Sequence, residues 1–170
     1  HTGSGCVAIG YEAMKLNTAN SNTAVGAYAL DANTTGGDVT AVGSAALGAN
    51  TTGAYNTAMG VSALGSNTTA GYSCSFGASS LSTVSTGGNN NAFGYGALNS
   101  YTGSDNNAFG AYAMHNTSTG SNNAAFGHRA MIANTTGTKN VAVGAYALDA
   151  VTTGEQNTAV GYNALSANTS

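Results

Sequence analysis

Asn22-Thr23-Ala24-Val25-Gly26 is the most informative segment of the sequence, because variants of it return along the whole chain. Nearly every variant places Ala, then an apolar residue, directly before a glycine. Ten such glycines follow one another at intervals of 16 or 17 residues: Gly10, Gly26, Gly43, Gly60, Gly77, Gly94, Gly110, Gly127, Gly144 and Gly161. A short unit repeated at one period predicts a stack of similar structural units. We therefore expect residues 1–170 to form a single repeat domain.

The composition is unusual for a globular protein. Charged residues make up 5% of the chain, against roughly 25% in typical soluble domains, and large aliphatic residues are scarce. A chain with so few large apolar residues is ordinarily disordered. Here the net charge is only −3 and the apolar residues recur with the repeat. Such periodic apolar positions are what a packed stack requires.

Two apolar columns run through the repeats. The residue before each motif glycine is always apolar, and the fourth residue after it is always Leu or Met. A unit of 17 residues is too short for a strand–helix–strand crossover, which needs about 30 residues. Two short strands joined by two turns do fit this length. The expected fold is all-β: a parallel β-roll, or β-solenoid, of about ten 17-residue coils.

Like residues should lie over like residues in such a stack. Side chains alternate between the two faces of a strand, so Thr23 and Val25 should share one face and Ala24 the other. Small Ala24-type residues would suit close packing between chains. Asn residues four positions before the motif glycine should form a hydrogen-bonded ladder. An aromatic ladder is expected from Phe76, Phe93, Phe109 and Phe126.

The turns are rich in Asn, Thr and Gly, as in Asn33-Thr34-Thr35-Gly36. Gly is expected there because it permits positive φ, and Asn because it caps its own backbone. The eighth residue after each motif glycine always carries a hydroxyl. These hydroxyls either bond their own backbone or accept glycans beside Asn-X-Ser/Thr sequons. The candidate glycan acceptors are Asn33, Asn50, Asn67, Asn116, Asn134 and Asn168, with Thr34, Thr51, Thr68, Thr135 and Thr152.

Tyrosines cluster just after the motif glycines. Tyr is amphipathic and fairly rigid, so it suits contacts with sugars and with protein partners. The same residues could instead make subunit contacts or cover the edge of the coil. The candidate surface-binding residues are Tyr11, Tyr28, Tyr95, Tyr112, Tyr146 and Tyr162.

Nothing in the sequence predicts catalysis. His1, His115 and His128 fall at different repeat positions, and no His, Asp, Glu or Cys cluster has metal-ligand spacing, so we expect no enzyme, metal site or cofactor. Charge this low does not predict nucleic-acid binding, and no apolar run is long enough for a membrane span. Cys6 and Cys74 lie four repeats apart, roughly 19 Å at ~4.7 Å per repeat, too far for a disulfide within the chain.

Two repeats carry a resemblance to a known family. Cys6-Val7-Ala8-Ile9-Gly10 and Asn140-Val141-Ala142-Val143-Gly144 resemble the coil motif of YadA-like trimeric autotransporter adhesin heads. The longer pattern from Asn157 to Leu165 is similar to repeats of phage tail fibres. The resemblance implies a left-handed parallel β-roll in which three chains pack side by side.

The function expected from these patterns is structural. The chain should be a segment of an extracellular, cell-surface or virion fibre, associated with copies of itself as a homotrimer, a head-to-tail polymer or both. An adhesin or tail fibre that binds surface glycans or a host receptor is the alternative. Ice binding is a minor alternative, because Thr-rich β-solenoids can present a flat Thr face.

Overall fold

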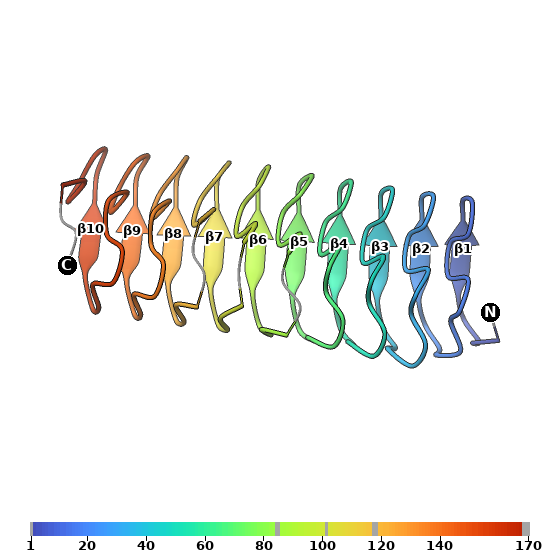
Figure 1. The fold of residues 1–170 in the computed structure, drawn as a ribbon. Coiled ribbons are helices and arrows are strands. Elements are labelled where there is room, and N and C mark those ends of the chain that lie inside the picture. Colours follow the sequence, from blue (N-terminus) through green and yellow to red (C-terminus); the bar gives the residue numbers. More distant parts are fainter. Residues whose placement is uncertain (1, 84–85, 101, 117–118, 168–170) are drawn as a thin grey trace.

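The computed structural model describes residues 2–83, 86–100, 102–116 and 119–167. It has no helix in these residues, and each repeat contributes one three-residue strand to a single parallel sheet of ten strands. Neighbouring strands in the sheet are neighbours in the chain, so the coils stand in one row from the N-terminal to the C-terminal end (Figure 1). The predicted all-β solenoid is confirmed. The strands are β1 Val7–Ile9, β2 Thr23–Val25, β3 Thr40–Val42, β4 Thr57–Met59, β5 Cys74–Phe76, β6 Asn91–Phe93, β7 Asn107–Phe109, β8 Ala124–Phe126, β9 Val141–Val143 and β10 Thr158–Val160.

The strands pair in phase with the repeat. Ala24 of β2 pairs with Ala41 of β3, and Val25 pairs with Val42. The 16-residue interval between Gly94 and Gly110 leaves the strand register unchanged, because Asn91 of β6 still pairs with Asn107 of β7. A slip of one residue would exchange the buried and exposed faces of a strand. The missing residue is therefore absorbed in a turn.

The core of each coil is thin. The Leu or Met four residues after the motif glycine is fully buried in nine coils, as at Leu30 and Leu47. It packs with the central Ala of β2 to β4 and β6 to β10, among which Ala24 and Ala41 are fully buried, and the central residue of β5 is the buried Ser75. The prediction that Ala24-type residues pack between chains is therefore wrong. Those residues face the interior of their own coil, and the residue before the glycine points outward.

Each coil has one strand, where the sequence suggested two. The stretch after the motif glycine is hydrogen-bonded to neighbouring coils: Leu47 N–H donates to Ala63 O at 3.0 Å, and Ala45 N–H donates to Ala27 O at 2.9 Å. However, φ is +55° at Ala45 and +51° at Leu47. Alternate residues in the left-handed region prevent an extended backbone. This part of the coil is a hydrogen-bonded zigzag instead of a second strand.

The turn glycines were expected to provide positive φ, but they are required because the backbone of the next coil lies very close to them. Gly36 is not in the left-handed region, but a Cβ atom there would lie 2.3 Å from Gly53 O in the next coil. The motif glycine Gly26 has φ of +138°, and a Cβ atom there would lie 2.5 Å from Gly43 O. At each of these two positions, the backbones of successive coils lie so close together that there is no room for a side chain.

The expected Asn ladder is present. Asn123 Oδ1 accepts the backbone N–H of Asn140 at 2.9 Å, and Asn106 Oδ1 accepts that of Asn123 at 2.9 Å. A second ladder, which the sequence analysis did not identify, runs through the turns. Asn50 Nδ2 donates both to Asn33 Oδ1 at 2.8 Å and to its own turn at Gly53 O. Buried amides therefore satisfy the backbone groups that lie between coils.

Candidate functional site

The outer side of the sheet carries no charge. We call the first and third residues of the ten strands the sheet face. The chain has nine Asp, Glu, Lys and Arg residues, and none of them lies in a strand. The third residue of every strand is apolar, and Met59 and Phe126 are 38% and 41% exposed. The first residues of the strands are mostly Thr and Asn, so the sheet face combines one apolar column with one largely polar, uncharged column.

Aromatic rings form the central part of the sheet face. Phe76 and Phe93 stack with ring centroids 5.0 Å apart, Phe93 and Phe109 at 4.6 Å, and Phe109 and Phe126 at 5.0 Å. The planes of each pair lie within 11° of parallel. The predicted aromatic ladder is confirmed, and it lies on the outer surface of the sheet.

A second aromatic surface follows the motif glycines in the last five coils. We call Tyr95, Tyr112, His128, Tyr146 and Tyr162 the aromatic row. Successive rings meet edge to face, at centroid distances of 5.3, 6.4, 5.6 and 6.1 Å. The residues alternate between the first and second positions after the glycine. That alternation is a signal that the sequence analysis missed, and it would have added His128 to the predicted tyrosines.

The predicted tyrosines therefore form two groups. Tyr11 and Tyr28 make a separate edge-to-face pair at 5.4 Å near the N-terminal end, and the other four belong to the aromatic row. Tyr112 is the centre of the row, because His115 and Arg129 also contact its ring, at 5.2 Å and 5.9 Å. Exposure is highest at Tyr162 and Tyr11, which are 74% and 67% exposed.

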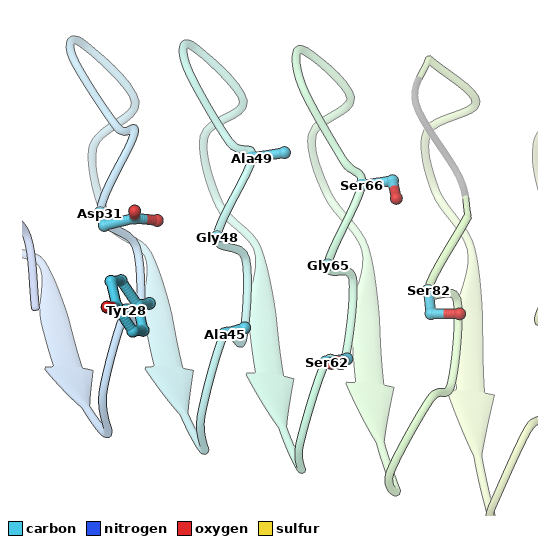
Figure 2. A pocket seen from close by; sticks show the side chains of 9 residues that line it. All are labelled: Tyr28, Asp31, Ala45, Gly48, Ala49, Ser62, Gly65, Ser66 and Ser82. Atoms are coloured by element: carbon cyan, nitrogen blue, oxygen red, sulfur yellow. The ribbon is translucent and has the colours of Figure 1, made fainter.

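A shallow hollow of about 470 Å³ lies between the two tyrosine groups. Figure 2 shows Tyr28 and Asp31 at one end of it and small residues along the coils that follow. Its floor is formed by Ala, Gly and Ser: Ala45, Gly48, Ala49, Ser62, Gly65, Ser66 and Ser82. The coils that line the hollow have small residues at the positions that Tyr28 and Asp31 occupy in the preceding coil.

Most of the candidate sequon asparagines lie inside the coil. Asn33, Asn50, Asn67 and Asn134 are fully buried and belong to the second Asn ladder or cap their own turns. A glycan on any of these amides would have to replace the interior of the turn. Among the described sequon asparagines, only Asn116 is exposed and remains a candidate glycan acceptor. Asn168 lies outside the described residues.

The turn hydroxyls act between coils. Thr34 Oγ1 donates to Thr51 O, Thr51 Oγ1 donates to Thr68 O, and Thr135 Oγ1 donates to Thr152 O, each at 2.9 Å. The five candidate threonines are half-buried. This geometry favours the structural interpretation, with one change: the bonded carbonyl belongs to the following coil rather than to the residue's own turn.

Cys6 and Cys74 are both free thiols, as their separation predicted. Cys74 lies on the sheet face at the start of β5, and burial raises the pKa of its thiol. Across the described residues, no group of three His, Cys, Asp or Glu side chains is placed to hold a metal ion. The same residues contain no helix that could cross a membrane.

Comparisons with known proteins identify no relative. No family model, no curated protein and no solved structure matches the chain.

Proposed function

We propose that the chain is a structural fibre segment, and that its rods associate laterally through the sheet face. The observation that carries this proposal is the charge-free outer surface of the ten-stranded sheet, along which the third residue of every strand is apolar. Every other side of the coil carries polar turns or charged residues. An extracellular or virion location is consistent with this role and stays part of the proposal.

A second copy of the chain is the partner that fits this surface best. Its sheet face has the same coil spacing, so each outward residue would meet an equivalent position at every step of ~4.8 Å. Its face is also free of charge, so no ionic group would be desolvated without a partner. Association would remove the phenylalanine ladder from water, at about 25 cal/mol for each Å² of apolar surface.

The width of the face favours more than two chains. Ten strands give a length of about 48 Å and three residues a width of roughly 10 Å, or about 500 Å². Stable interfaces bury about 800 Å² on each partner. Three chains around one axis would let each sheet face contact two others. The trimer implied by the resemblance to adhesin heads agrees with this estimate.

The test is the mass of the native particle by light scattering. We expect a multiple of the 16.5 kDa chain mass, and a monomer for Phe109→Lys, which places a charge in the centre of the sheet face. The matched control is Tyr55→Lys, because Tyr55 is also an exposed, stacked aromatic residue but lies outside the sheet. A monomeric wild-type chain at high concentration would refute lateral association.

Glycan binding is the second candidate function, and the aromatic row favours it. Exposed tyrosine rings in a continuous line on a rigid support suit contact with the apolar faces of sugars. Binding of glycans to the wild-type chain, and loss of it in a Tyr95→Ala and Tyr162→Ala double variant, would support this role. Equal binding by both proteins would contradict it.

A further inference from the structure

One exposed cation lies beside the aromatic row. The Arg129 guanidinium lies over the Tyr112 ring, 5.9 Å from its centroid, and its side chain is exposed. The one ion pair among the described residues joins Lys15 and Glu12, so no described carboxylate oxygen lies within 4.0 Å of the Arg129 guanidinium nitrogens. An exposed guanidinium held against a ring keeps its five donors available to an outside acceptor.

Two imidazoles contact the same tyrosine. The centroid of the His115 ring lies 5.2 Å from that of Tyr112, and the centroid of His128 lies 6.4 Å from it. His115 Nδ1 is 2.8 Å from Gly96 O. Because a carbonyl oxygen only accepts, Nδ1 carries the proton, and in the neutral ring Nε2 is then an acceptor.

Gly96 makes this arrangement possible. A Cβ atom at Gly96 would lie 3.3 Å from both the Tyr112 ring and His115 Nδ1. The equivalent residue in other coils carries a side chain, such as Tyr28 or Ser62. Its absence at Gly96 lets the Tyr112 ring and the His115 imidazole lie against the preceding coil.

We propose that Tyr95, Tyr112, His115, His128 and Arg129 form a binding site for a sugar that carries one carboxylate. A guanidinium binds a carboxylate through two parallel hydrogen bonds. The exposed rings of Tyr95 and His128 offer apolar contact to the sugar ring. The Nε2 of His115 accepts a hydrogen bond from a sugar hydroxyl.

The charges at this surface favour a ligand with one negative charge over a polyanion. Nucleic acids and highly sulfated polysaccharides bind through several cations at once. This surface has one fixed cation, on a chain whose net charge is −3. The proposal rests on the second candidate function, glycan binding by the aromatic row, and specifies its ligand. It uses residues outside the sheet face, so the failure of lateral association leaves it standing.

The probe is the methyl glycoside of N-acetylneuraminic acid. Its binding to the full chain is measured by saturation-transfer difference NMR. We expect saturation transfer to the protons of the sugar. The methyl ester of the same glycoside, which lacks the charge, should bind about tenfold more weakly. Equal binding of acid and ester, absence of binding by the acid, or stronger binding of single-stranded DNA would overturn the proposal.

Substitutions assign the site. Arg129→Gln should weaken binding of the acid about tenfold and leave the ester unaffected, while Arg129→Lys should recover part of the loss because lysine keeps the charge without the fork. The matched control is Lys139→Gln, an exposed cation with φ of +59° against +56° at Arg129, but outside the aromatic row. Unchanged binding in Arg129→Gln, or an equal loss in Lys139→Gln, would refute the assignment.

Discussion

Phe93 and Phe109 stack on the outer side of the sheet with their ring centroids 4.6 Å apart and 6° between the ring planes. Each ring belongs to a different coil, so the contact ties two repeats together without entering the core. Such a stack stabilises the coil interface and at the same time gives the rod an apolar surface. The same residues therefore matter for folding and for association.

Replacement of Phe109 tests the contribution of ring stacking. Phe109→Ala removes contacts with Phe93 and Phe126 and should lower the free energy of unfolding by about 2–4 kcal/mol. Phe109→Leu keeps most of the apolar volume and should cost about 1–2 kcal/mol, since two ring pairs are still lost. Chemical denaturation measures both values. A Leu variant as stable as the wild type would mean that only burial matters there.

Replacement of two adjacent glycines by alanine should change stability by very different amounts. Gly36→Ala places a Cβ atom 2.3 Å from Gly53 O, a clash between backbones that should cost about 3 kcal/mol or more. Gly37→Ala places its Cβ atom 3.5 Å from the nearest atom, Asn20 O, and should change stability by less than about 1 kcal/mol. Thermal unfolding of the two variants decides the matter. Equal losses would show that the coils are not packed so closely.

Two alanines that line the hollow should respond differently to replacement by glycine, because only one of them lies in the left-handed region. The change in the free energy of unfolding should have opposite signs at the two positions. Ala45 has φ of +55°, where an L-residue costs about 1–2 kcal/mol, so Ala45→Gly should be neutral or stabilising by up to about 1 kcal/mol. Ala49 is outside the left-handed region, so Ala49→Gly should destabilise by about 0.5–1 kcal/mol. Denaturant titration of both variants gives the comparison. Destabilisation of similar size at both sites would contradict the assigned backbone.

Cys74 should react slowly with alkylating agents until the pH is high. Burial raises the pKa of its thiol, and only the thiolate is the nucleophile. In a Cys6→Ser background, the rate of reaction with iodoacetamide should rise at higher pH in the folded chain than in the same chain in denaturant. Coincident pH profiles would show that burial does not perturb the thiol.

The same shift has a consequence for stability. The folded chain holds the Cys74 proton to higher pH than the unfolded chain does, so the free energy of unfolding should fall as the pH rises through the unfolded pKa towards the folded one. Below the unfolded pKa the effect is absent. Cys74→Ser should remove this alkaline loss, and an unchanged pH dependence would contradict the assignment.

The period, the all-β class and the stacking of equivalent residues over one another could be predicted from the order of residues alone. These follow because coil-to-coil pairing requires units of nearly equal length, and because Ala, Val and Leu return at fixed positions within each unit. The Phe ladder and the first Asn ladder could be predicted for the same reason. The free state of Cys6 and Cys74 followed from their separation along the stack.

Which face of each strand lies inside the coil could not be predicted and depends on the packing in three dimensions. Ala24 and Val25 are both apolar, so the sequence does not distinguish a buried residue from an outward one. The structure places Ala24 inside because the Leu30 column already fills the narrow coil and leaves room only for a methyl group. Val25 and its equivalents are forced outward, and this creates the sheet face.

The meeting of Tyr112, His115 and Arg129 also depends on tertiary structure. Tyr112 and Arg129 both sit at left-handed positions, with φ of +59° and +56°, which sequence patterns do not reveal for residues of this size. The path of the backbone through these positions brings side chains of two coils onto one ring. Spacing along the chain gave only their repeat positions, and the three-dimensional turn decided that they share a site.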